Sequence, residues 1–124
     1  MPKLSARSER NLATAHPDLQ KVFRKVAETW PIEVICGHRP KEAQDQAFRE
    51  GHSKERWPNS RHNSLPSQAV DVLPLPIDWE NLEPFKRLAK HVKEIAGLMG
   101  VALEHGGDWQ HLRDFPHWQL ASKH

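Results

Sequence analysis

Four residues in the second half of this chain could do chemistry together: His62, Asp71, Asp114 and His117. Two histidines and one carboxylate can hold a zinc ion and still leave one coordination position open. Asp114 lies three residues before His117, so a second carboxylate is available beside that open position. This set of residues predicts metal-assisted hydrolysis, in which a base removes a proton from an activated water.

Strand alternation gives two of these residues a reason to face a metal. Val70 and Val72 flank Asp71 in an apolar run, and the two valines are expected to point into the core. Asp71 then points to the opposite face, where a buried carboxylate without a cation would be costly. His117 begins another apolar run of the same kind, and His62 lies near the end of a long loop. Three separate segments are therefore expected to converge on one ion.

The residue types favour zinc over magnesium or calcium, because the latter two prefer shells made of oxygen atoms. Asp114 is predicted to act as the base, and Arg39 to bind a substrate carboxylate or to stabilise an oxyanion. Spacing alone leaves a second interpretation open, since the chain has nine histidines and an unrelated scatter of surface histidines would give similar intervals.

The elements that must position these residues can be read from periodicity and from proline and glycine signals. We expect a small α+β domain with a short antiparallel sheet flanked by helices. The loop at 51–68 has no period, and loops of that length in compact domains are usually functional or disordered. The predicted helices are 5–15, a segment from 16 to the Trp30-Pro31 pair, 41–50 and 82–100; the predicted strands are 32–37, 69–73, 101–104 and 117–120, with a tight turn at Gly106-Gly107.

Side-chain types predict which faces are buried. The helix at 41–50 is expected to bury Ala43, Ala47 and Phe48, and Cys36 is expected to be a buried structural cysteine. Among the five tryptophans, three are expected in or at the edge of the core and two in segments that form a cleft. The first group is Trp30, Trp79 and Trp118, and the second is Trp57 and Trp109.

Length and composition bound the remaining possibilities. With 124 residues, 27% charged and 37% hydrophobic, the whole chain (1–124) is expected to be a single domain with no separate binding module. A net charge of only +2 argues against a nucleic-acid binder. One cysteine excludes an internal disulfide. No stretch predicts a secretory signal or a membrane span, so we expect synthesis in the cytoplasm and no stable membrane association. We also expect a monomer.

Short motifs around the candidate ligands give the set a family. The segments 60–62 and 66–71 resemble the Ser-x-His…Ala-x-Asp motif of the zinc D-Ala-D-Ala carboxypeptidase family, which includes vancomycin-resistance D,D-peptidases and phage L-alanyl-D-glutamate endopeptidases. Segments 106–109 and 114–120 are similar to the closing motif of the VanY-like phage endolysin branch, and Gly37-His38-Arg39-Pro40-Lys41-Glu42-Ala43-Gln44 is similar to Gly-Tyr-Arg-Ser-x-x-x-Gln. These blocks occur in family order over about two-thirds of the chain.

The resemblance implies a hedgehog/D-Ala-D-Ala-peptidase-like fold that hydrolyses a peptide bond of the peptidoglycan stem peptide, in the phage branch the L-Ala–D-Glu bond. It implies a Zn²⁺ ion held by His62, Asp71 and His117. It implies that Asp114 is the general base and that Arg39 stabilises charge in the substrate and transition state. The substrate contacts that we expect are Ser60, Arg39, His38 and Trp109. An enzyme of this kind would reach the periplasmic murein after release from the host cytoplasm by a holin.

The chain departs from the family pattern in three places. Asp114 stands where the carboxypeptidases have Glu, the interval from His62 to Asp71 is two residues longer, and His105 replaces an aromatic residue before the double glycine. The last change predicts a more polar cleft wall. Two alternatives therefore stay open: a D,D- or L,D-carboxypeptidase on the same scaffold, and a catalytically silent zinc-containing module that binds the cell wall.

Overall fold

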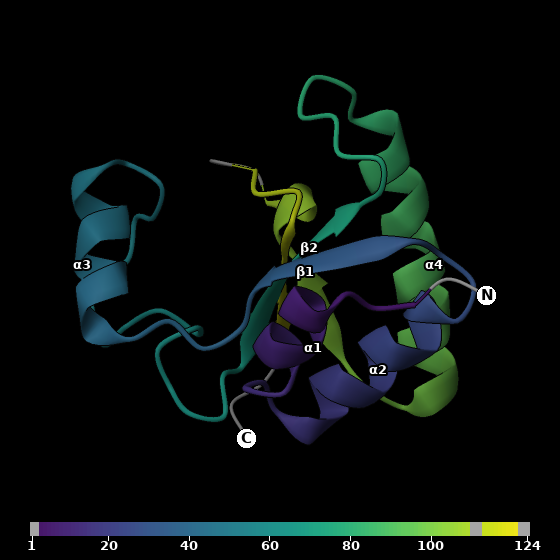
Figure 1. The fold of residues 1–124 in the computed structure, drawn as a ribbon, viewed down its shortest axis with the longest axis horizontal. Helices are drawn as coiled ribbons and strands as arrows, with labels where there is room; N and C mark the ends of the chain where they lie inside the picture. Colours follow the sequence, from purple (N-terminus) through teal and green to yellow (C-terminus); the bar gives the residue numbers. More distant parts are fainter. Residues whose placement is uncertain (1–2, 110–112, 122–124) are drawn as a thin grey trace.

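The computed structural model describes residues 3–109 and 113–121. Four α-helices, four strands and one short 3-10 helix follow each other along this part of the chain (Figure 1). In chain order they are α1 (Ala6–Leu12), α2 (Pro17–Ala27), β1 (Ile32–Cys36), α3 (Lys41–Arg49), β2 (Ala69–Pro74), α4 (Glu83–Met99), β3 (Leu103–His105), η1 (Gly106–Asp108) and β4 (His117–Leu120).

The strands form one antiparallel sheet in the order β1-β2-β4-β3. The predicted α+β class with a short antiparallel sheet is therefore confirmed. Three elements differ from the prediction: the first helix is Ala6–Leu12 rather than 5–15, the third strand is Leu103–His105 rather than 101–104, and the double glycine opens a 3-10 helix instead of a simple turn. The shifts amount to a few residues, as is usual at the ends of short elements.

One face of the sheet and three helices enclose the core. Val34, Val70, Val72, Trp118 and Leu120 contribute from the strands and are almost fully buried. The side chains opposite them come from α1, α2 and α4, which Figure 1 shows grouped on one side of the molecule. The helix α3 stands apart from these three, on the other side of the sheet. It therefore serves a purpose other than covering the core.

Three predictions of burial differ from the structure. Ala43 is exposed, and the side chain that α3 buries completely is Gln44. Trp79 is 58% exposed rather than in the core, whereas Trp118 is buried as predicted. Cys36 is only partly buried. The first two errors share a cause. Because α3 and the segment before α4 face a polar cleft, burial in the hydrophobic core could not be predicted there from helical periodicity or residue size.

The long loop at 51–68 is held by backbone hydrogen bonds at its second half. Arg39 N donates to His62 O at 2.7 Å, Gln68 N to Arg61 O at 2.8 Å, and Ser67 N to Thr14 O at 2.9 Å. Two of these bonds fix the end of the loop against the segments that follow β1 and α1, so this half of the loop is ordered. Among the helices described, none combines the length and apolar character needed to cross a bilayer.

Candidate metal centre

Strand register brings Asp71 and His117 together. The two residues are directly paired between the antiparallel neighbours β2 and β4, and paired side chains on one face of a sheet lie close to each other. The His117 Nδ1 atom is 3.3 Å from Asp71 Oδ1. Because Trp118 and Leu120 point into the core, His117 must face the same side of the sheet as Asp71. The predicted alternation is therefore confirmed.

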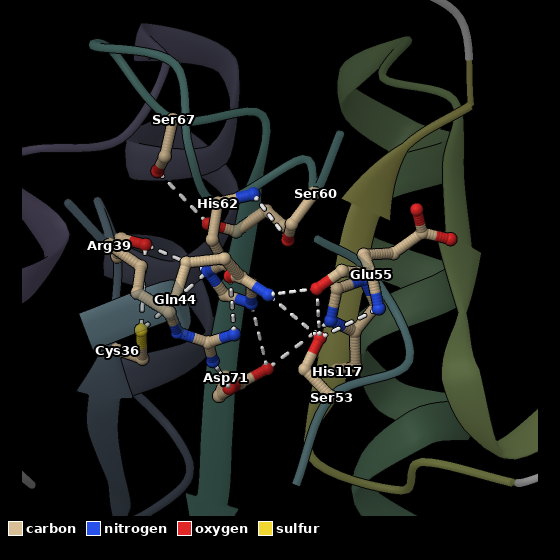
Figure 2. Close-up of polar contacts among 12 residues, drawn as sticks. Cys36, Arg39, Gln44, Ser53, Glu55, Ser60, His62, Ser67, Asp71 and His117 are labelled. Atoms are coloured by element: carbon tan, nitrogen blue, oxygen red, sulfur yellow. Dashed lines mark hydrogen bonds and ion pairs between the residues drawn. The ribbon is translucent and has the colours of Figure 1, made fainter. Parts of the chain in front are cut away.

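The loop at 51–68 delivers His62 to the same point. The His62 Nε2 atom is 3.2 Å from Asp71 Oδ1, and the His62 ring is 5.1 Å from the His117 ring between centroids. Both histidines are buried, and Asp71 is 14% exposed. Figure 2 shows the side chains of His62, Asp71 and His117 turned toward one another from three segments. The structure thus brings together all three residues that the sequence predicted as ligands.

Hydrogen bonds on the far side of each imidazole fix which nitrogen is free. His62 Nδ1 is 2.7 Å from the Gly37 carbonyl oxygen, which can only accept, so this nitrogen carries the proton. His117 Nε2 donates to Gln119 Oε1 at 2.8 Å, and the Gln119 amide is oriented because its nitrogen donates to Glu104 at 2.8 Å. Outer partners of this kind orient the histidine ligands of metal sites.

The donor set fits a zinc ion. With their protons directed outward, the neutral imidazoles of His62 and His117 present lone pairs toward the same Asp71 oxygen. Three electron-rich atoms in a buried site repel one another unless a cation lies between them. Two nitrogens and one carboxylate oxygen are ligands that zinc accepts, and such a set leaves a coordination position open. The described residues can therefore hold the predicted ion.

Without a metal, a proton supplies part of the missing positive charge. Burial opposes the protonation of His62, but the Asp71 carboxylate outweighs it and raises the pKa of His62 to about 10. Burial likewise opposes ionisation of Asp71, yet His62 and His117 hold its pKa far below the ordinary value. The ion pair stabilises the metal-free fold fully between the ordinary pKa values of aspartate and histidine. This contribution is lost as pH rises through about 10, where His62 deprotonates, and as pH falls toward the depressed pKa of Asp71.

Metal affinity is expected to depend steeply on pH. A cation must displace the His62 proton at any pH below about 10, so the affinity for zinc should rise by about tenfold per pH unit. Competition with a chromophoric chelator across neutral pH measures this slope. An affinity that is constant over that range, after correction for the chelator's own protonation, would contradict the proton displacement.

Asp114 borders the same site from the segment before β4. One of its carboxylate oxygens lies within 4.8 Å of the ligand atoms offered by Asp71 and His117. Burial raises the pKa of Asp114 and the nearby Asp71 carboxylate raises it further. Asp114 N donates to Gly106 O at 3.0 Å, and a Cβ atom on Gly106 would lie 2.3 Å from Asp114 O. Glycine at 106 is therefore required for this segment to approach the site.

Arg39 supports the site through Asp71 and is held by a residue that the sequence analysis gave no role. Arg39 Nη2 lies 3.5 Å from Asp71 Oδ2, and Arg39 Nη1 donates to Gln44 Oε1 at 3.0 Å. The same Gln44 oxygen accepts from Asn63, while Gln44 Nε2 donates to Ser53 Oγ at 2.9 Å and to Glu55 O at 2.6 Å (Figure 2). Gln44 thus joins the arginine to the start of the long loop.

Replacement of Gln44 by leucine is expected to destabilise the protein by about 3 kcal/mol, because it leaves buried hydrogen-bonding partners unsatisfied. Gln44→Glu keeps an acceptor for Arg39 but faces the Glu55 carbonyl with a second acceptor, so it should lose less stability. Denaturant unfolding measures both effects. Gln46→Leu on the exposed side of α3 is the matched control, and equal midpoints for Gln44→Leu and Gln46→Leu would contradict this role.

A cleft of about 880 Å³ opens above the metal centre. It contains Arg39, Asp71, Asp114 and both histidines, together with Ser60 and Trp109. The Trp109 ring lies 5.2 Å from the His117 ring. These positions place most of the predicted substrate contacts along the cleft.

Two histidines that were predicted to lie at the cleft do not line it. The His38 ring lies 3.0 Å from the Ser64 carbonyl oxygen, and His38 is absent from the cleft lining. His105 is buried, stacks on Trp118 with centroids 4.1 Å apart, and contacts Phe115 O at 2.7 Å. The predicted polar cleft wall at His105 is therefore wrong, because this imidazole supports the segment beside Asp114 from within.

Cys36 approaches the centre from behind His62. Its Sγ atom is 3.7 Å from His62 Nδ1, the nitrogen that faces Gly37 O. Cys36, His62 and Asp71 are close enough to form a possible ligand group. However, the thiol contacts the His62 nitrogen that faces Gly37 O, whereas His62 faces Asp71 with its other ring nitrogen.

Comparison with known proteins decides the family. A family model described as phage L-alanyl-D-glutamate peptidase matches residues 1–119. The chain belongs to this family. The L-alanyl-D-glutamate peptidase of Escherichia phage T5 is 31% identical over 118 residues, which cover 91% of this chain and 85% of that protein. The family predicted from the motifs around His62, Asp71 and His117 is therefore confirmed.

A solved structure supports the assignment of this chain to the phage peptidase family. The crystal structure of the Serratia marcescens L-Ala D-Glu endopeptidase ChiX is 35% identical to this chain and superposes with a TM-score of 0.81. The match covers 95% of this chain and 90% of that one. The fold and the order of its elements are thus those of an endopeptidase scaffold.

Proposed function

We propose that this protein is a zinc-dependent peptidoglycan endopeptidase that hydrolyses the L-Ala–D-Glu bond of the stem peptide. The observation that carries this proposal is the convergence of His62, Asp71 and His117 at the floor of a cleft, with Asp114 beside them. Family membership supplies the reaction class, since the relatives are named as peptidases of this bond.

The three convergent residues hold the ion and Asp114 moves the proton. When bound, zinc supplies Lewis acidity that polarises a substrate carbonyl and activates water. Asp114 takes a proton from the attacking water and returns it to the departing amino nitrogen of D-Glu. In the metal-free protein, burial and the Asp71 carboxylate raise the pKa of Asp114, and a raised pKa makes a carboxylate a stronger base.

Arg39 stabilises negative charge next to this centre. Its guanidinium contacts Asp71 and borders the cleft, so it can fix the ligand carboxylate with one nitrogen and face the substrate with others. Ser60 accepts a hydrogen bond from His62 N at 3.2 Å. We propose that Ser60 shapes the loop around His62 and that Trp109 contacts the substrate beside His117.

The cleft supports cleavage within a chain rather than at its end. Besides the residues of the metal centre, the cleft is lined by residues of the segment at 51–61 and by Trp79, Leu82 and Phe85. An endopeptidase requires space for substrate on both sides of the scissile bond. We further propose that the enzyme acts as a monomer on murein after release from the cell interior.

Digestion of purified murein by the zinc-loaded protein tests this function. Mass spectrometry should find new L-Ala carboxyl ends and new D-Glu amino ends. Release of terminal D-Ala instead would identify a carboxypeptidase, and intact murein in the presence of bound zinc would indicate a binding module. A sample stripped by a chelator is the control, and it should regain activity when zinc is restored.

A further inference from the structure

The segment between β2 and α4 exposes four large apolar side chains. Trp79 is 58% exposed, Ile77 49%, Leu82 40% and Leu75 36%. Exposed apolar side chains gathered in one place usually mark a binding surface. Two of them, Trp79 and Leu82, also line the cleft that contains the metal centre. This exposed surface is therefore continuous with the proposed active site.

A row of aromatic rings connects this surface to the proposed base. The Trp79 ring lies 6.0 Å from the Phe85 ring, and Phe85 lies 6.3 Å from Phe115, which follows Asp114 in the chain. Phe85 is buried, so it supports the indole of Trp79 from beneath and leaves that indole accessible. We refer to Trp79, Phe85 and Phe115 as the aromatic wall of the cleft.

The opposite side of the cleft has a different chemical character. Arg39, Lys54 and Arg61 line the cleft as well, together with Glu55 and the two carboxylates of the metal centre, Asp71 and Asp114. Figure 1 shows α3 well apart from the segment that leads into α4. Arg113 also lines the cleft, with its Nε donating to Trp109 O at 3.3 Å. One side thus favours anions and the other favours neutral, flat groups.

The substrate of the proposed reaction has the same asymmetry. On the D-Glu side of the scissile bond the stem peptide carries free carboxylates. On the other side stands one alanine, joined through a lactyl group to the muramic acid of the glycan strand. One residue spans only about 3.5 Å, so this sugar must lie in or beside the cleft whenever the bond is at the metal centre.

We propose that Trp79 is the platform of a glycan subsite, on which the N-acetylated sugar ring of muramic acid stacks. This inference rests on the proposed function for the identity of the substrate. The anionic D-Glu side then lies along Arg39, Lys54 and Arg61, and the neutral sugar lies along the aromatic wall. An exposed indole offers a large rigid face and one N–H donor at little cost in side-chain entropy.

Two matched substrates test the subsite by kinetics. The first is a stem peptide with its muramic acid, and the second carries only the lactyl group, so the two differ by the sugar ring alone. The zinc-loaded enzyme should cleave the first with a kcat/KM about tenfold higher, within the range that one tryptophan contributes to binding. Trp79→Ala should abolish this preference while leaving the lactyl peptide unaffected, and Trp79→Phe should restore most of it.

Trp57→Ala is the matched control, since Trp57 is 41% exposed and does not line the cleft. It should keep the full preference for the sugar. An equal loss on both substrates in Trp79→Ala would overturn the glycan subsite, because it would show that Trp79 serves the peptide or the fold. Equal kcat/KM for the two substrates in the unaltered enzyme would also overturn it.

A binding measurement separates this inference from the proposed function. Titration with the disaccharide of N-acetylglucosamine and N-acetylmuramic acid, without peptide, should shift the Trp79 indole N–H resonance and leave that of Trp57 in place. Failure to cleave either substrate would remove the proposed function, whereas absence of the shift would remove the subsite alone. A shift that depends on protein concentration instead would identify a second copy of the chain as the occupant and overturn the proposal.

Discussion

Asp114→Ala is expected to reduce kcat by about 10²–10⁴-fold while the protein still binds zinc. The size of the loss is that of a positioned general base. Retention of zinc follows if His62, Asp71 and His117 suffice as ligands. Folding should not suffer, since burial and Asp71 already disfavour the ionised form of Asp114 and raise its pKa. Murein turnover, metal analysis and thermal unfolding of the same sample measure the three effects.

The alternative to this role is coordination by Asp114 itself, because its carboxylate can form a ligand group with Asp71 and His117. Loss of zinc in Asp114→Ala would establish that alternative. Asp108→Ala is the matched control: Asp108 is exposed and pairs with Lys93 at 2.6 Å on the surface. It should keep both zinc and turnover.

His117→Ala is expected to lose zinc and activity together. Removal of one of three protein ligands weakens binding more than removal of an outer partner, which alone costs about 10–100-fold in metal affinity. The substitution also leaves Asp71 facing only His62, so excess zinc should not restore full activity. Metal content after dialysis and murein turnover at saturating zinc are the measurements.

His91→Ala provides the comparison for a lost imidazole away from the cleft. His91 lies on α4 beside Trp30, with ring centroids 5.5 Å apart. This variant should bind one zinc with unchanged affinity. Full lytic activity of His117→Ala, or of a zinc-free preparation of the unaltered protein, would refute the metallopeptidase assignment.

The sequence was sufficient to predict the part of the site that depends on strands. Alternation places Asp71 opposite the buried Val70 and Val72, and His117 opposite the buried Trp118. The apolar runs were clear enough that the class of fold and the bounds of most elements were predicted closely. The motifs then assigned the family, which the spacing of histidines alone could not do.

The cleft could not be predicted in the same way, because its walls depend on how distant segments meet. Gln44 was part of a motif, yet its buried amide has meaning only when Arg39, Asn63 and the chain at Glu55 surround it. Trp79 was assigned to the core on residue type alone, although its segment lies at the cleft mouth. The error at His105 is the reverse. It was predicted to line the cleft because it is polar, but its imidazole is buried and stacks on Trp118.

The direct pairing of Asp71 with His117 makes the metal centre a reporter of correct folding. If β2 slipped by one residue against β4, Asp71 and His117 would lie on opposite faces of the sheet, and the core valines of β2 would be exposed. Only molecules with the native pairing can therefore retain the ion, and zinc supplied during refolding should enrich them by mass action. The same hydrogen-bonded register specifies both the hydrophobic interior and the chemistry above it.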